Sequence, residues 1–280
     1  MKVYRTKSGL SGHLSSLSFG LKTIGLVPTM GALHQGHTSL VKKAKEENDV
    51  VVVSIFVNPT QFNDPSDLEH YPRNLESDLN MLQKLGVNLV FVPSVQEMYP
   101  EKDTRIFDLG TLDQDLEGKQ RKGHFNGVAQ IVSKLFLICA PNRAYFGQKD
   151  FQQLVIIRRL VEIMEMDISI VACPIIRERD GLAMSSRNVK LNSGDRKLAP
   201  FIYATLKEAS EKKPSFSPSE VKAWVVKRFK EQPDLNLEYF EIVEDKELRP
   251  VLDWQESVNK VACLAVQLGG VRLIDNMNFD

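Results

Sequence analysis

The feature that most constrains this chain is a short apolar run that leads into a turn with two glycines and two histidines. The run Ile24–Val27 predicts a buried strand, and residues 27–41 read VPTMGALHQGHTSLV. Leu40, Val41 and Ala44 recur at helical spacing, so a helix is expected after the turn. A strand that turns into a helix points free backbone N–H groups and the positive end of the helix dipole at one spot, which suits a phosphate.

The glycines and histidines of this turn favour phosphate binding. Gly31 and Gly36 have no side chains where a phosphate must approach the backbone closely. His34 and His37 are three positions apart, so at a helix start they share a face, and each can donate a hydrogen bond to a phosphoryl oxygen. Two alternatives stay open from these residues alone: ordinary surface histidines, or a metal site with His124 as a third ligand.

The composition is that of a globular protein without a marked charge. Of the 280 residues, 42% are hydrophobic and 26% charged, and Lys plus Arg equals Asp plus Glu. Such a balance gives no support for nucleic acid binding. We see no signal-peptide core in the first 20 residues and no apolar stretch of membrane-spanning length. Cys139, Cys173 and Cys263 lie in separate apolar runs and predict buried thiols in a reducing compartment, so a cytoplasmic protein is expected.

Strand and helix patterns alternate up to about residue 175. Val50–Val57 predicts a second buried strand, which ends at Asn58-Pro59-Thr60-Gln61-Phe62. The carboxyl ends of parallel strands line the ligand crevice, so Gln61 is placed where a substrate would be recognised. After residue 175 we expect a capped helix from Ser217 and strands at 237–243, 260–268 and 271–274. The sequence therefore predicts an α/β catalytic domain, 1–175, and a smaller α+β lid, 176–280.

Two further stretches carry side chains suited to a triphosphate. Gly147-Gln148-Lys149-Asp150 forms a second strand-to-helix turn, in which the lysine is a point charge for phosphate oxygens. Asp150 also fits a plain helix cap, and Gln153 lies one turn into the helix and can share the crevice. Met184-Ser185-Ser186-Arg187 places two hydroxyls and a guanidinium after a glycine turn.

Three weaker expectations concern the segments around these stretches. Residues 63–74 are polar and contain two prolines, so a mobile loop that closes over substrates is expected. Residues 113–122 are rich in charge and are expected to be exposed. Asn126 is the expected N-cap of a helix that ends at Cys139, and His124 either reaches the crevice or braces the turn.

These motifs resemble one enzyme family. The first turn resembles the H-x-G-H signature of the nucleotidyltransferase superfamily, and the longer string Pro-Thr-Met-Gly-Ala-Leu-His-x-Gly-His is similar to the pantothenate synthetases, also called pantoate–β-alanine ligases. The segments at 58–62, 147–153 and 184–187 match that family in its order and near its spacing. The resemblance implies a Rossmann-like parallel sheet in the N-terminal domain, and a homodimer.

The resemblance also implies the reaction and its residues. It implies an ATP-dependent ligase that joins (R)-pantoate to β-alanine through a pantoyl adenylate, releasing AMP and pyrophosphate. His34, His37 and Lys149 are the expected catalytic residues, and Gln61 and Gln153 are expected to bind pantoate and β-alanine. ATP is expected to contact three segments, which contain Met30, Gly31, Ala32, Leu33, His34, Gln35, Gly36 and His37, then Gly147, Gln148, Lys149 and Asp150, then Ile176, Met184, Ser185, Ser186 and Arg187.

Magnesium is expected on the β- and γ-phosphates. The resemblance places Asp78 at a position linked to that ion, although many family members carry a second acid where this chain has Ser77. Two rival functions stay open: another nucleotidyltransferase of the superfamily, which need not share Gln61 or Gln153, or a non-catalytic nucleotide sensor.

Overall fold

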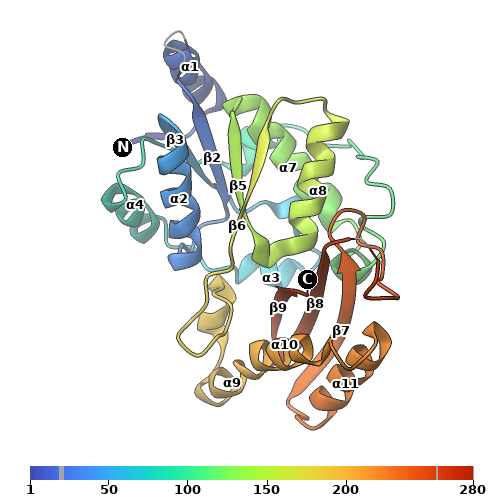
Figure 1. Ribbon diagram of the computed structural model, residues 1–280. Helices are drawn as coiled ribbons and strands as arrows, with labels where there is room; N and C mark the ends of the chain where they lie inside the picture. Colours follow the sequence, from blue (N-terminus) through green and yellow to red (C-terminus); the bar gives the residue numbers. More distant parts are fainter. Residues whose placement is uncertain (19–21, 257, 280) are drawn as a thin grey trace.

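The computed structural model describes residues 1–18, 22–256 and 258–279, and two β-sheets organise them (Figure 1). The first sheet has six strands in the order β1-β4-β3-β2-β5-β6, and every neighbouring pair is parallel. Its strands are Lys2–Tyr4 (β1), Ile24–Thr29 (β2), Val50–Ile55 (β3), Leu89–Phe91 (β4), Arg143–Gly147 (β5) and Ser169–Cys173 (β6). This arrangement confirms the predicted α/β class with a Rossmann-like parallel sheet.

Helices cover both faces of the first sheet. One face packs on α2 and α4, with Val27 and Val53 pointing towards them, and the other packs on α1, α7 and α8, with Leu26 and Val52 pointing that way. Both sides of each central strand are therefore buried, which explains the nearly continuous apolar runs in the sequence. The helices are Lys7–Ser18 (α1), Gln35–Glu47 (α2), Leu75–Lys84 (α4), His124–Cys139 (α7) and Phe151–Ile163 (α8).

Short helices connect these elements. They are Pro59–Gln61 (η1), Pro65–Glu69 (α3), Val95–Met98 (α5), Leu116–Gln120 (α6), Gln148–Asp150 (η2) and Ser186–Lys190 (η3). The strand order reverses at β2, which pairs with β3 on one side and with β5 on the other. Ligands bind at such a reversal, outside the carboxyl ends of the strands. The first turn follows β2 and the lysine turn follows β5, so both predicted phosphate turns lie there.

The second sheet is antiparallel and builds its own core. Its strands are Leu235–Glu244 (β7), Lys260–Leu268 (β8) and Val271–Asn278 (β9), and helices Ser193–Leu198 (α9), Phe201–Lys212 (α10) and Pro218–Lys230 (α11) accompany it. Ser217 and Glu220 form the predicted capping box of α11. The predicted domain boundary at residue 175 stays a prediction. The first sheet ends at Cys173, and the second hydrophobic core begins at Leu182.

One local prediction is wrong in part and another is wrong, and both errors come from partners outside the segment. Of residues 113–122, which the sequence predicts to be exposed, 114, 115, 119, 120 and 122 are exposed, but Leu116, Glu117 and Gly118 are buried. Glu117 is buried in α6 because Arg272 on β9 binds its carboxylate at 2.6 and 2.7 Å. Asn126 is not an N-cap, since α7 begins at His124 after Gly123, whose φ is +79°. The Asn126 amide binds the backbone of residues 105 and 107. None of the described helices is long and apolar enough to cross a membrane.

The ion pair between Glu117 and Arg272 gives a stability prediction. Burial raises the pKa of Glu117, but Arg272 outweighs it, so the net pKa is lowered and the carboxylate is charged. Arg272→Met should cost about 3–5 kcal/mol in the free energy of unfolding, because it leaves a buried charge uncompensated. The double variant Glu117→Gln/Arg272→Met should recover much of that loss. Urea unfolding measures both variants, and a double variant as unstable as Arg272→Met contradicts this account.

Candidate active site

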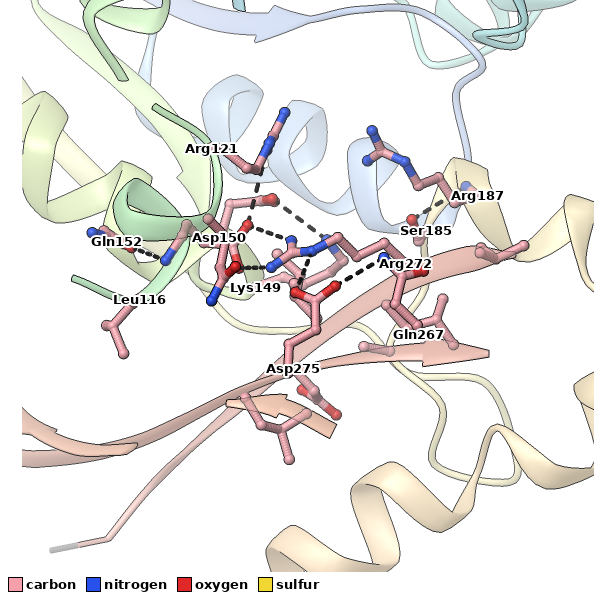
Figure 2. A pocket seen from close by; sticks show the side chains of 18 of the residues that line it. Leu116, Arg121, Lys149, Asp150, Gln152, Ser185, Arg187, Gln267, Arg272 and Asp275 are labelled. Carbon is pink, nitrogen blue, oxygen red and sulfur yellow. Dashed lines mark hydrogen bonds and ion pairs between the residues drawn. The ribbon is translucent and has the colours of Figure 1, made fainter. Parts of the chain in front are cut away.

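Two adjoining cavities lie at the carboxyl ends of the strands of the first sheet, and the larger one extends to the second sheet. The smaller cavity lies over the turn after β2, and the larger one, of about 520 Å³, reaches β8 and β9. They share Lys149, Asp150, Gln153, Ser185 and Arg187. Figure 2 shows the larger cavity, which Arg121, Lys149 and Arg272 line from three different parts of the chain. We call the two cavities together the crevice.

The crevice brings together most of the predicted site residues. Fourteen of them line the smaller cavity: Met30, His34, Gly36, His37, Gln61, Gly147, Lys149, Asp150, Gln153, Ile176, Met184, Ser185, Ser186 and Arg187. The other predicted positions do not line either cavity, namely Gly31, Ala32, Leu33, Gln35, Asp78 and Gln148. These six residues lie in the two turns or support them, but they do not line the cavities.

The two histidines form a capping box at the start of α2. The Nδ1 atom of His34 accepts the N–H of Gly36 at 3.1 Å, and the Nδ1 atom of His37 accepts the N–H of His34 at 3.3 Å. A neutral imidazole that accepts through Nδ1 carries its proton on Nε2. The helix start therefore fixes the tautomer of both rings and leaves each with an Nε2–H donor. The ring centroids lie 4.1 Å apart.

The surroundings keep both imidazoles neutral. Burial and the nearby Lys149 charge lower the pKa of His34 from 6.5 to about 4. Burial and the neighbouring His34 lower the pKa of His37 from 6.5 to about 3. At neutral pH the two rings therefore act as hydrogen-bond donors through Nε2, and the positive charge in this part of the crevice comes from lysine and arginine.

Glycine at two points of the histidine turn has a local structural reason. Gly31 has a φ of +79°, and a Cβ there would lie 2.9 Å from Oδ2 of Asp78. A Cβ at Gly36 would lie 2.8 Å from Cε1 of His34, so only glycine lets that ring close over the helix start. The predicted close approach of a phosphate at these glycines stays a prediction.

Asp78 braces the same turn. The carboxylate is buried, and its two oxygens accept the N–H groups of Ala32 and Leu33 at 2.9 and 2.8 Å. Asp78 is therefore a structural brace of the turn, and its metal role stays a prediction. No cluster of three or more His, Cys, Asp or Glu side chains in the described part of the chain is arranged to hold a metal ion.

Gln61 is held in place on the opposite wall of the crevice. Its side-chain oxygen accepts from Asn58 at 3.1 Å, and its Nε2 lies 3.1 Å from the sulfur of Met30, a weak acceptor. His124 Nδ1 donates to the backbone oxygen of Gln61 at 2.6 Å, while His124 Nε2 accepts from Arg121. His124 therefore braces the turn and also lines the larger cavity, so both alternatives for this residue describe it. Because both of its ring nitrogens are engaged, it is a poor third metal ligand beside the paired histidines.

Two ion pairs lie in the crevice. Lys149 lies 3.5 Å from Asp150, and Arg187 binds Asp67 of α3 at 2.9 Å. Burial raises the pKa of Asp150, but Lys149 and Arg187 outweigh this effect and lower it. Asp150 occupies the N-cap position of α8, but its side chain makes no capping hydrogen bond there. Tyr71 also lines the crevice, and its hydroxyl lies 3.3 Å from the Ser186 hydroxyl.

The comparisons with known proteins agree with this geometry. The chain matches the family model described as pantoate-beta-alanine ligase over residues 2–278. It is 50% identical to the pantothenate synthetase of Porphyromonas gingivalis over the whole of both chains. It is 52% identical to that of Phocaeicola vulgatus, with 100% of this chain and 99% of the relative covered. The chain belongs to the pantoate–β-alanine ligase family.

Solved structures of this family have the same fold. The pantothenate synthetase from Thermus thermophilus superposes with a TM-score of 0.93 at 41% identity, over 100% of this chain and 99% of that chain. The pantoate-beta-alanine ligase from Francisella tularensis, solved with beta-gamma ATP and beta-alanine, gives 0.83 at 38% identity, over 100% and 98% of the two chains. These findings confirm the predicted family and fold.

Sequence reasoning missed Arg121 as part of the crevice. Arg121 lines the larger cavity, donates to His124, and lies 3.9 Å from the Glu117 carboxylate (Figure 2). Burial lowers the pKa of Arg121, and the charges of Arg187 and Arg272 lower it further. A group of like charges held this close favours a polyanionic ligand. Arg121 lies in the turn between α6 and α7, so no helical periodicity in the sequence marks it.

The lowered histidine pKa values predict a pH dependence of stability. Burial and the Arg121 charge also lower the pKa of His124, from 6.5 to about 4. Between pH 6.5 and 4 the unfolded chain therefore binds more protons than the folded chain, so stability is lost as the pH falls through this window. His124→Gln should reduce the slope of the unfolding free energy against pH by at most about 1.4 kcal/mol per pH unit. Urea unfolding from about pH 7.5 to about pH 4.5 tests this expectation, which an unchanged slope would contradict.

Proposed function

We propose that the crevice joins (R)-pantoate to β-alanine in two steps, with ATP as the second substrate of the first step. One observation carries this proposal. The paired histidines, Lys149 and two glutamines line the same cavity, at the point where the strand order reverses. Membership of the family supports the ligase activity itself. The roles given below to single residues are inferences from their positions.

A free carboxylate is a poor acceptor for an amine, because oxide would have to leave. In the first step, a carboxylate oxygen of pantoate attacks the α-phosphorus of ATP, and pyrophosphate leaves. In the second step, the amine of β-alanine attacks the acyl carbon, AMP leaves with the bonding pair, and the amine loses a proton. The site must therefore hold the carboxylate in line with the α-phosphate and stabilise the charge that develops there.

The phosphate side of the crevice fits that electrostatic task. His34 and His37 present Nε2–H donors from the start of α2, where the helix dipole is also positive. Lys149 adds a full charge from the neighbouring turn, and Arg187 adds another once it exchanges Asp67 for a phosphate. These donors are held before ATP binds, so little reorganisation is needed when charge develops.

The opposite side fits pantoate, which has one carboxylate, two hydroxyls and an apolar gem-dimethyl group. Gln61 and Gln153 come from different elements, η1 and α8, and each amide can both donate and accept. Val128, Ile131 and Val132 of α7 line the same cavity and offer an apolar wall.

Magnesium, the homodimer and the cytoplasmic location complete the proposal. Because the Asp78 oxygens are engaged by the turn, we infer that Mg²⁺ enters as a chelate of the β- and γ-phosphates, with Lys149, Arg121 and Arg187 around those phosphates. The family resemblance supports the homodimer and the cytoplasm.

Pyrophosphate release that depends on pantoate tests the proposed function against both rivals. With ATP, Mg²⁺ and pantoate, the protein should release pyrophosphate, and β-alanine should then yield AMP and pantothenate. Another nucleotidyltransferase would release pyrophosphate only with a different acceptor, and a nucleotide sensor would bind ATP without turnover. Either result overturns the proposal.

Lys149 should act mainly in the first step. Its charge matters most while the phosphorus carries extra negative charge, and less when AMP is already a leaving group. Lys149→Ala should therefore slow adenylate formation far more than the attack of β-alanine on preformed pantoyl adenylate. Rapid-quench measurement of both steps checks this, and an equal loss in both would show that the lysine only holds the AMP moiety.

Gln153 and Arg187 should separate the two substrates. Gln153→Ala should raise the pantoate KM by roughly tenfold to a hundredfold, because a buried substrate group loses its partner at a cost of about 1–3 kcal/mol. Arg187→Ala should instead weaken ATP, since its guanidinium faces the phosphate side. Titration of each variant with pantoate and with ATP is the measurement. The reverse pattern would show that the two sides of the crevice are assigned wrongly.

A further inference from the structure

Strand β9 carries two adjacent polar residues near its end that are both buried. Asp275 and Asn276 are 3% and 6% exposed, although polar side chains at this depth are costly without partners. Neighbouring residues of a strand point to opposite faces, so the two side chains reach different parts of the molecule. The sequence pattern predicts the end of this strand at residue 274, whereas the structure extends it to Asn278.

Asn276 reaches the catalytic turn. Its Nδ2 donates to the backbone oxygen of Gln148 at 2.8 Å and to that of Lys149 at 3.0 Å. The amide therefore donates to two successive backbone carbonyls of η2, the turn that carries the lysine. Two hydrogen bonds to neighbouring peptides fix the position of the turn and also its rotation about the chain.

Asp275 holds the end of β9 against the segment that leads to Met184–Arg187, another stretch expected to contact ATP. Its carboxylate binds both terminal nitrogens of Arg177, at 2.6 and 2.9 Å, and accepts the N–H of Asn276 at 2.8 Å. Arg177 stacks over the Tyr203 ring at 4.0 Å and pairs with Ala183 just before Met184. The end of β9 is thus fixed to the segment leading to Met184–Arg187 as well as to the lysine turn.

We propose that Asn276 is a positioning residue for Lys149, so that the second sheet helps to set the first chemical step. This inference rests on the proposed role of Lys149. A lysine ammonium sits on a flexible four-carbon stem, so its reach depends on where the backbone anchors it. The two carbonyls held by Asn276 belong to that anchor, and an error of about 1 Å in placing a reacting group can cost about 10²-fold in rate.

A matched control is available in the same chain. Gln130 on α7 is also 6% exposed, and its Nε2 also donates to two backbone carbonyls, those of Asp103 and Arg105 at 3.1 and 2.9 Å. Those carbonyls lie outside both cavities. Gln130→Leu therefore removes the same kind of buried amide bracing without touching the lysine turn.

The experiment compares single-turnover rates of adenylate formation. Asn276→Leu keeps the shape of the side chain and removes both donors, and Asn276→Ala tests the same loss if the leucine variant does not fold. Either variant should slow adenylate formation by about tenfold to a hundredfold. We expect less than a threefold change in the ATP and pantoate KM values and a smaller effect on the second step. Gln130→Leu, with a similar loss of stability, should change the rate less than about twofold.

A double-mutant cycle with Lys149→Ala distinguishes positioning from plain structural support. If Asn276 acts through the lysine, adding Asn276→Leu or Asn276→Ala to Lys149→Ala should cost little further rate. Full additivity, or an Asn276 variant no slower than Gln130→Leu, overturns the inference while the proposed function stands. A Lys149→Ala variant with wild-type adenylate formation would overturn the proposed role of the lysine and this inference together.

Discussion

The histidine capping box is the interaction on which the chemistry of this fold depends. The first N–H groups of a helix have no partner within the helix, and here two imidazole Nδ1 atoms supply partners for two of them. That single arrangement ends the turn after β2, starts α2, fixes the tautomer of His34 and His37, and directs their remaining donors outward. Gly36 follows from it, because a side chain there would collide with the His34 ring. The same hydrogen bonds therefore stabilise the start of the helix and fix which ring nitrogen of each histidine carries the proton.

The parallel sheet converts this local arrangement into a site. Because β2 and β5 are neighbours, the histidine turn and the lysine turn open at the same edge, although more than 100 residues separate them. Carboxylates balance the cations of the crevice: Asp67 pairs with Arg187, Asp150 with Lys149, and Glu117 with Arg272. Each of these three cations therefore has a carboxylate partner in the protein without ligand. In the proposed function, the same cations attract a triphosphate.

Local signals in the sequence predicted most of the fold, and distant contacts explain what they missed. The apolar runs identified strands β2 and β3, and Ser217 with Glu220 identified the start of α11, because their causes lie within a few residues. The burial of Glu117 depends on Arg272, which is more than 100 residues away, so charge alone suggested a surface. The last residues of β9 pair with β8, and the Asn276 side chain among them is buried against η2, again more than 100 residues away. For the site, motif resemblance identified the lining, whereas the bracing by Asp78, His124 and Asn276 appears only in three dimensions.

The strength of these contacts indicates which part of the crevice moves most easily. The second sheet is joined to the first by a buried ion pair between Glu117 and Arg272 and by the buried amide of Asn276, and separating such groups is expensive. Helix α3 is joined to the phosphate side by Asp67 and Arg187, whose side chains are 31% and 28% exposed, and ion pairs of that exposure contribute about 0–1 kcal/mol. The cheaper motion is therefore that of the 63–74 loop rather than of the whole second sheet. If ATP binds as proposed, its phosphates replace Asp67 on Arg187 without leaving the guanidinium unpaired, and this exchange allows the motion.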